Sequence, residues 1–382
     1  MKETNNTLGV VGAGAMGSGI AQVAATAGWT VMMYDQDPEA LKSGINKISK
    51  IFDRLVTKGR LDIKEKDVIL SRIHPIDDLS SFSSADLVIE AIVEKLDIKK
   101  SVFKELEKIT NADCILASNT SSLSITSIAS AVEKPEKIIG IHFFNPPGLM
   151  KLVEVIPGYL TSSEVVHTCK KIISEWGRVV VVAKDSPGFI VNKIARPFYS
   201  EAIRIVEEGI AQPGEVDWVM TTQGGFRMGP FTLMDYIGHD VNYAVTESVW
   251  KAFYHEPRYQ PSLTQKRLVE AGLLGRKAGR GFYDYRDGGQ PQLTEVDAEK
   301  SEMILNRILA MLINEAADTV YYDICTEEDA DLAMTRGVNY PLGLIEWGEK
   351  IGWRKVAKIL HDLYAKYKEE RYRTSVYILN KI

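Results

Sequence analysis

The stretch TLGVVGAGAMGSGIAQVAA, residues 7–25, decides the fold of the N-terminal part of the chain. Its first five residues are mostly apolar and predict a buried strand, and the residues from 15 onward have a helical pattern. Gly12, Gly14 and Gly17 stand between the two. Glycines at this spacing allow a tight turn, a close approach of the backbone to a pyrophosphate, and close packing of helix on strand. The amides at the helix N-terminus then favour an anion. We therefore expect a dinucleotide at the turn Gly12-Ala13-Gly14-Ala15-Met16-Gly17.

Asp35 indicates which dinucleotide binds. It ends the next apolar run, TVMMYD, about 20 residues after the glycines. A carboxylate at this place can accept hydrogen bonds from both ribose hydroxyls of the adenosine, and it would repel a 2′-phosphate. The sequence therefore favours NAD over NADP. The alternative is a glycine-rich turn that binds no ligand.

The segment from Thr7 to about Ala183 alternates short apolar runs with helical patterns. The runs are TLGVVG, TVMMYD, ADLVIEAI, CILASNT, IIGIHFF, LVEVI and VVVVA. Such alternation predicts a mostly parallel, doubly wound sheet, with helices such as residues 38–55 covering its faces. The Pro-Pro-Gly turn at residues 146–148 is too short for a crossover helix, so the last strands should include an antiparallel hairpin.

The rest of the chain has helical periodicity. Ser186 before Pro187 is a favourable helix start, and the polar stretch 287–292 is typical of a linker. A shift of 114 positions superposes the third segment on the second, and the matched residues include Asn192/Asn306, Glu201/Glu315 and Asp217/Asp331. Polar identities of this kind indicate duplication. We expect an α/β, Rossmann-like, doubly wound sheet domain (residues 1–186) followed by two tandem all-α helical domains (187–288 and 289–382).

Composition limits the classes of partner. The 382 residues are 45% hydrophobic and 25% charged, with 46 basic and 51 acidic side chains and a formal charge of −5. This predicts no nucleic-acid partner and no membrane association. The three cysteines are far apart, without metal-ligand spacing, which suits a reducing compartment. Because the N-terminus MKETNNT is polar, we expect a cytoplasmic protein with no metal site.

His142 and Glu154 lie in GIHFFNPPGLMKLVEVI, residues 140–156. If the hairpin turn centres on Gly148, the two residues face each other. An imidazole held by a carboxylate can accept the proton of a secondary alcohol as hydride leaves. The alternative is a hydrogen-bonded core histidine with the glutamate on a solvent face. Ser121, in the polar segment 118–122 after another strand, is similarly ambiguous, since serines before a helix are usually caps.

These segments resemble the L-3-hydroxyacyl-CoA dehydrogenase family. The resemblance covers residues 7–285 and rests on VVGAGAMGSGIAQVAA, LVIEAIVEKLDIKK, ASNTSSLSIT, GIHFFNPPGLMKLVEVI, DSPGFIVNKI, MGPFTLMDYIG and GRKAGRGFYDY. The remainder looks like a second copy of the family's helical domain, of the 6-phosphogluconate dehydrogenase C-terminal type, as found in longer relatives.

The resemblance implies roles for single residues. His142 is the general base, Glu154 its partner, and Ser121 the hydroxyl that contacts the 3-oxygen of the substrate. Asn192 would bind near the thioester. Apart from the resemblance, Lys58, Arg60 and Lys64 are candidates for contact with the phosphates of CoA, and the alternative is a charged helix end on the surface. The implied NAD contacts, beside the glycine turn and Asp35, are Glu94, Lys99, Ser121, Asn145 and Lys277.

The implied activity is reversible, NAD-dependent oxidation of (S)-3-hydroxyacyl-CoA to 3-ketoacyl-CoA in fatty-acid or phenylacetate-type β-oxidation. Three alternatives stay open: a dehydrogenase specific for 3-hydroxyadipyl-CoA, one acting on free hydroxy acids or sugar acids, and a crystallin-like NAD-binding protein without activity. A dicarboxylic tail would require a cation such as Arg196 or Arg227. The tandem helical copies predict a monomer with an internal pseudo-dimer, or else a homodimer.

Overall fold

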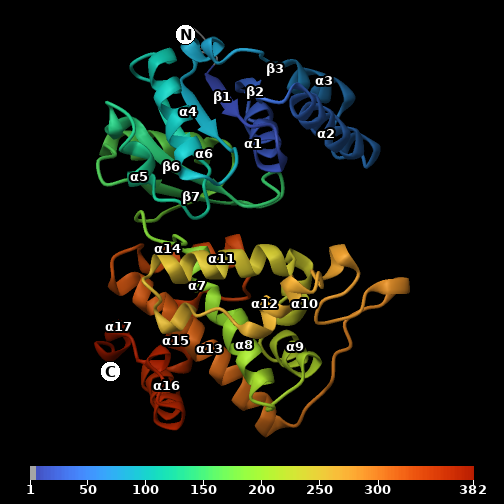
Figure 1. The fold of residues 1–382 in the computed structure, drawn as a ribbon, viewed down its shortest axis with the longest axis vertical. Coiled ribbons are helices and arrows are strands. Elements are labelled where there is room, and N and C mark those ends of the chain that lie inside the picture. The colour runs from blue at the N-terminus through green and yellow to red at the C-terminus, as the bar shows by residue number, and fades with distance from the viewer. Residues whose placement is uncertain (1–5) are drawn as a thin grey trace. The chain divides into compact units, whose positions relative to one another are not determined.

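The computed structural model describes residues 6–382, so residues 1–5 of the polar N-terminus lie outside the described part. The chain forms two compact units, one ending at Ser186 and the other running from Pro187 to Ile382 (Figure 1). The first unit contains a sheet with covering helices, and the second is built from helices. The predicted fold class, a doubly wound α/β domain followed by an all-α part, is confirmed.

The sheet has the strand order β3-β2-β1-β4-β5-β6-β7-β8. Its strands are β1 Thr7–Val11, β2 Thr30–Tyr34, β3 Ile73–Pro75, β4 Leu87–Glu90, β5 Ile115–Ser118, β6 Ile138–Phe143, β7 Leu152–Pro157 and β8 Val179–Val182. Neighbours run parallel except β6 and β7, which form the expected antiparallel pair. The order reverses between β1 and β4, and ligands of such sheets bind beyond the carboxyl ends of the strands at this point. The short edge strand β3 was not expected from the sequence.

Between residues 6 and 186 the first unit has six α-helices: α1 Ala15–Thr26, α2 Pro38–Thr57, α3 Ile63–Ser71, α4 Leu96–Ile109, α5 Ile125–Ala129 and α6 Ser163–Glu175. Short polar residues fix where several of them begin. Asp37 caps α2 by accepting from the Glu39 amide at 2.9 Å, and Pro38 occupies the first turn, where no amide is needed. Ser124 caps α5 in the same manner.

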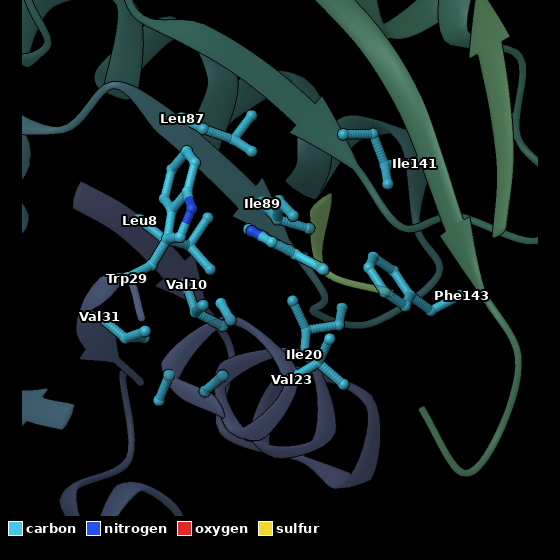
Figure 2. Packing of buried hydrophobic residues seen from close by; sticks show 14 of the residues in the cluster. Leu8, Val10, Ile20, Val23, Trp29, Val31, Leu87, Ile89, Ile141 and Phe143 are labelled. Atoms are coloured by element: carbon cyan, nitrogen blue, oxygen red, sulfur yellow. The ribbon is translucent and has the colours of Figure 1, made fainter. Parts of the chain in front are cut away.

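One layer of the core of this unit lies between α1 and the sheet. Figure 2 shows apolar side chains from the strands and from α1 pointing toward one another. The labelled set is Leu8, Val10, Ile20, Val23, Trp29, Val31, Leu87, Ile89, Ile141 and Phe143, all buried. Each such side chain contributes about 1.5–3 kcal/mol on burial. This packing holds the ends of β1, β4, β5 and β6 in fixed positions.

The second unit contains α7 Val191–Ile194, α8 Arg196–Glu207, α9 Pro213–Thr222, α10 Pro230–Ile237, α11 His239–Ala252, η3 Pro257–Tyr259, α12 Leu263–Glu270, η4 Arg276–Ala278, α13 Ala298–Tyr321, α14 Glu327–Gly337, α15 Leu344–Ile351, α16 Trp353–Tyr367, η6 Glu370–Tyr372 and α17 Val376–Leu379. The expected helix start at Ser186-Pro187 is wrong, because Gly188 and Phe189 have φ values of +76° and +49° and form a turn before α7.

Within residues 6–382, no helix is long and apolar enough to cross a membrane.

The order of elements in this unit repeats. Helices α9 and α10 begin at Pro213 and Pro230, and α14 and α15 begin at Glu327 and Leu344, in each case 114 positions later. In both sets a longer helix and a one-turn 3₁₀ helix follow, and α13 packs along α8. All these helices belong to one compact unit. The division into two domains at 288/289 therefore stays a prediction.

Candidate active site

The glycine turn has the geometry that a dinucleotide requires. Gly12 has φ +102°, and a Cβ atom there would lie 2.6 Å from the Ala91 carbonyl oxygen. A Cβ on Gly17 would lie 1.8 Å from the Gly12 oxygen, so this glycine permits the contact of helix and strand. Gly14 is the N-cap of α1, and a Cβ there would meet nothing within 4 Å. The open side of the turn is therefore where a pyrophosphate fits, against the first amides of α1.

Asp35 lies directly beyond β2 and is bound to the same turn. Its Oδ2 accepts from the Ala13 amide at 2.7 Å and its Oδ1 from the Asp37 amide at 3.0 Å. Each carboxylate oxygen keeps a second lone pair. The side chain is thus fixed beside the turn and can still accept hydrogen bonds from a ribose, as the sequence predicts for NAD.

Glu90, at the end of β4, is fully buried and organises the neighbouring strand ends. It accepts from the Ile92 amide at 2.7 Å, from Lys99 Nζ at 2.6 Å and from Ser118 Oγ at 2.7 Å. Sequence reasoning gave Glu90 no separate role. The signal was an acidic residue ending an otherwise apolar strand, with a lysine on the following helix.

Lys99 is only 1% exposed, and its ammonium lies between Glu90 and Glu94. Lys99 Nζ lies 2.6 Å from Glu90 Oε1 and 3.3 Å from Glu94 Oε2, so it forms ion pairs with both carboxylates. Burial alone would raise the pKa of Glu94, but the Lys99 charge and the hydrogen bonds from Thr120, Ser122 and Ser121 outweigh it and lower the pKa. Glu94 is accordingly held as a carboxylate.

Glu94 fixes the loop that carries Ser121. Its Oε1 accepts from Thr120 Oγ1 at 2.5 Å, from the Ser121 amide at 3.0 Å and from the Ser122 amide at 3.2 Å. Because Ser124 is the cap of α5, the capping interpretation does not apply to Ser121. Among residues 6–382 the structure gives the Ser121 hydroxyl no hydrogen-bond partner, although the loop around it is fully bonded.

His142 and Glu154 are directly opposed in the β6–β7 register, as the hairpin argument predicts. His142 Nδ1 lies 2.7 Å from Glu154 Oε2, and the side chains are 7% and 0% exposed. The alternative with Glu154 on a solvent face is therefore wrong. A carboxylate at Nδ1 assigns the proton to that nitrogen and leaves Nε2 as the acceptor. The ring of Phe144 lies 4.6 Å away.

Two further residues stand near the end of β6. Asn119 Oδ1 accepts from the Phe143 amide at 2.8 Å and ties the end of β5 to the end of β6; sequence reasoning gave it no role. Asn145, a predicted NAD contact, is exposed and follows Phe144 at the start of the hairpin turn. The glycine turn, Asp35, Glu94, Ser121, His142 and Asn145 therefore lie at or just beyond the ends of β1, β2, β4, β5 and β6, on one edge of the sheet.

The remaining predicted residues are dispersed. Lys58 is exposed directly after α2 in the first unit. Asn192 is half-buried on α7, and its carbonyl accepts from Arg196 Nε at 2.8 Å. Lys277 pairs with Asp240 at 2.6 Å, and this hydrogen bond lowers the pKa of Asp240. Asn192 and Lys277 belong to the second unit, so their roles at the site stay predictions.

Comparisons with known proteins cover both units. Residues 7–186 match the family model described as 3-hydroxyacyl-CoA dehydrogenase, NAD binding domain, and residues 188–285 and 303–381 match the corresponding C-terminal domain. The chain is 37% identical to 3-hydroxyadipyl-CoA dehydrogenase of Escherichia coli K12 (96% of this chain, 95% of that one). It is 45% identical to a probable 3-hydroxybutyryl-CoA dehydrogenase of Deinococcus radiodurans (72% and 99%). The crystal structure of 3-hydroxybutyryl-CoA dehydrogenase from Escherichia coli K12 superposes with a TM-score of 0.94 at 35% identity (99% and 98%).

Proposed function

The chain belongs to the 3-hydroxyacyl-CoA dehydrogenase family, and we propose that it oxidises (S)-3-hydroxyacyl-CoA to 3-ketoacyl-CoA with NAD, in a reversible reaction of β-oxidation. One observation carries the proposal: a buried His142–Glu154 pair at the end of β6, in the same sheet whose β1 leads into the dinucleotide turn. A nicotinamide cofactor and a histidine base are the two groups that oxidation of a secondary alcohol needs.

In the proposed mechanism, His142 Nε2 accepts the proton of the 3-hydroxyl. NAD held by the Gly12–Gly17 turn and Asp35 would supply the acceptor for the hydride of the 3-carbon. Glu154 holds the ring through Nδ1 and stabilises the imidazolium that forms. The Ser121 hydroxyl donates to the same oxygen, from a loop that Glu94 keeps in place. In the reverse direction His142 returns the proton to the alkoxide.

The proposal includes three further residues. Asn192 is proposed to bind near the thioester, Lys277 near NAD, and Lys58 near the CoA phosphates. The chain is proposed to be cytoplasmic and to form a monomer with an internal pseudo-dimer, rather than a homodimer. The acyl chain is not fixed by the relatives, because their names refer to hydroxyadipyl and to hydroxybutyryl thioesters.

The proposal is tested by following the loss of NADH absorbance with acetoacetyl-CoA, in parallel with NADPH and with free acetoacetate. We expect turnover only with NADH and the CoA ester. Turnover of free acetoacetate would instead support a hydroxy-acid dehydrogenase. If the protein binds NADH but turns over no hydroxyacyl-CoA or ketoacyl-CoA of any tested length, a non-enzymatic binding protein is the better description.

A further inference from the structure

Arg196 is a buried cation whose partners are all neutral. It is the first residue of α8 and is 5% exposed. Nε donates to the Asn192 carbonyl at 2.8 Å, and Nη1 donates to Thr246 Oγ1 at 3.0 Å. The guanidinium also lies 5.0 Å from the centre of the Tyr199 ring. Among residues 6–382 no carboxylate forms an ion pair with it.

The other buried cations of the second unit are paired. The pairs are Lys193 with Glu315, Arg258 with Glu315 and Asp318, Arg307 with Glu201 and Glu208, and Arg371 with Glu201 and Glu369. Burying a charge without a counter-charge is costly, so unpaired charges are rare in protein interiors. Burial lowers the pKa of Arg196, whereas the carboxylates of Glu315 and Asp318 outweigh burial and raise the pKa of Arg258. Arg196 therefore lacks an anion that each of the other four has.

Tyr340 adds a second unsatisfied group at this place. It is 6% exposed, and its hydroxyl has no hydrogen-bond partner among the described residues. Its ring lies 5.7 Å from that of Phe198, two residues after Arg196 on α8. A guanidinium and a phenolic hydroxyl together offer several donors in a region otherwise lined by aromatic rings.

The repeat shows that the fold does not require these polar groups. Shifted by 114 positions, Arg196 corresponds to Ala310, which is buried on α13, and Tyr340 corresponds to Phe226. Each of the two positions is thus apolar in the copy. The two polar groups thus come from different copies, Arg196 from the first and Tyr340 from the second, and the other copy has an apolar residue at each matching position.

We propose that Arg196, assisted by the Tyr340 hydroxyl, binds a carboxylate at the far end of the acyl chain. The substrate class is then the mono-CoA thioester of a 3-hydroxy dicarboxylic acid, with the six-carbon 3-hydroxyadipyl group as the test case. This inference rests on the proposed function. Asn192, the predicted thioester contact, precedes Arg196 by four positions, or roughly 6 Å along a helix. A short dicarboxylic chain has the length to reach from one residue to the other.

The experiment compares two substrates that differ only at the tail: 3-hydroxyadipyl-CoA, which ends in a carboxylate, and 3-hydroxyhexanoyl-CoA, which ends in a methyl group. We expect the wild-type kcat/KM to be higher for the dicarboxylic substrate. Arg196→Gln should lower that value about 10²-fold while changing the hexanoyl value by less than about threefold. Tyr340→Phe, which removes one oxygen, should lower the same ratio several-fold.

Arg227→Gln is the matched control, because it removes the same charge from an exposed position in the same unit. It should keep the wild-type ratio. The proposal is overturned if the wild type prefers the hexanoyl substrate, if Arg196→Gln lowers both values equally, or if Arg227→Gln is the variant that loses selectivity. Equal losses would assign Arg196 to helix packing.

A binding measurement separates this inference from the proposed function and does not depend on a folded variant. The wild-type protein is titrated calorimetrically with adipyl-CoA and with hexanoyl-CoA, neither of which can react. Tighter binding of adipyl-CoA by about tenfold or more supports the carboxylate site even if no hydroxyacyl-CoA is turned over. Equal binding, or tighter binding of hexanoyl-CoA, rejects the site even if the dehydrogenase activity is present.

Discussion

At the scale of single residues, the position of Glu154 decides what His142 can do. The carboxylate at Nδ1 fixes both the tautomer and the orientation of the ring, so that Nε2 is the nitrogen that can accept a proton. Because Glu154 is fully buried, its charge is poorly screened by water and acts mainly on the imidazole. The pair should therefore behave as one catalytic unit.

The first prediction concerns this pair. His142→Gln should lower kcat/KM for acetoacetyl-CoA reduction by about 10²–10⁴, because it removes the proton donor, and should leave the Kd for NADH within about threefold. Rates are measured by NADH absorbance and binding by NADH fluorescence. A variant that loses both activity and NADH binding would show damage to the sheet instead.

Glu154→Gln tests the coupling within the pair. It should lower kcat by a smaller factor, since the amide can still hold the ring but cannot offset a positive charge. The double variant should be little worse than His142→Gln alone, because residues that act as a unit have non-additive effects. Fully additive losses would mean that Glu154 acts independently of the histidine.

Asp35 carries the second prediction, on cofactor choice. Asp35→Ser removes the charge that should repel a 2′-phosphate, so the preference for NADH over NADPH is expected to fall by about 10². The measurement is the ratio of kcat/KM for the two cofactors. Asp37→Asn is the matched control, because it removes a charge two residues away while keeping a good cap for α2. An equal fall in both variants would assign the effect to overall charge.

At the scale of elements, the turn between β1 and α1 contains two glycines with different roles. Gly17 is required for packing of the helix on the strand, and Gly14 leaves space for a ligand. Gly14→Ala places a methyl group where the structure has open space, whereas Gly17→Ala places it 1.8 Å from the Gly12 oxygen. Gly14→Ala should keep the melting temperature within about 2 °C and weaken NADH binding at least tenfold, since the methyl group occupies the side open to a pyrophosphate. Gly17→Ala should lower the stability of the first unit by more than about 2 kcal/mol. Thermal unfolding and NADH fluorescence check both; unchanged NADH binding in Gly14→Ala would contradict the assignment of the turn.

Elements with strong local signals were predictable from the sequence. Seven strands coincide with apolar runs of the sequence. The pairing of His142 with Glu154 follows because opposed residues in a hairpin have position numbers with a constant sum. The three-residue strand β3 was missed because it is short, ends in Pro75 and lies at the sheet edge, where proline is tolerated. The helix start at Pro187 failed because the next two residues have positive φ.

Contacts between distant positions were not predictable. Asp185 accepts hydrogen bonds from the Ile125 and Thr126 amides, some 60 positions earlier, and so fixes the start of α5. Nothing in the local sequence indicates this. The role of Glu90 between Lys99 and Ser118 likewise depends on which strands are neighbours. The sequence therefore predicts the reacting residues better than the residues that hold them.

At the scale of the whole molecule, the second unit contains a nearly symmetric charge network. Lys193 binds Glu315, and Arg307, 114 positions after Lys193, binds Glu201, 114 positions before Glu315. Tyr259 Oη donates to Glu315 at 2.5 Å, and Tyr372 Oη donates to Glu201 at 3.0 Å. In each contact, a cation or tyrosine of one copy binds a glutamate of the other copy. In the matching contact, the two copies exchange these roles. This reciprocity is the pattern of an isologous, two-fold interface.

The fourth prediction concerns the oligomeric state. If the two copies form such an interface inside one chain, the surface used for it is already occupied. We expect a monomer in gel filtration with light scattering at micromolar concentration. A stable dimer that covers α8 and α13, detected as added hydrogen-exchange protection of those helices on association, would contradict the internal pseudo-dimer.

The last prediction tests whether the symmetry extends to energetics. Glu201→Gln and Glu315→Gln each leave buried cations without full compensation, and removal of one partner from a buried ion pair costs about 3–5 kcal/mol. Both should lower the stability of the second unit by similar amounts, measured by urea unfolding together with hydrogen exchange of α8 and α13. Asp362→Asn, which breaks the exposed pair with Lys358, should change it by less than about 0.5 kcal/mol.

Similar losses in the two variants would mean that each copy stabilises the other as the subunits of a dimer do. Arg196 and Tyr340, which are apolar in their counterparts, would then be departures from a symmetric scaffold and would belong to the ligand site. If only Glu315→Gln lowers the stability of the second unit, the stabilising ion pairs are those of Glu315 with Lys193 and Arg258. In that case the two copies would share only the order of their elements. The comparison of Arg196 with Ala310 would then no longer show that the fold can do without a cation at this position.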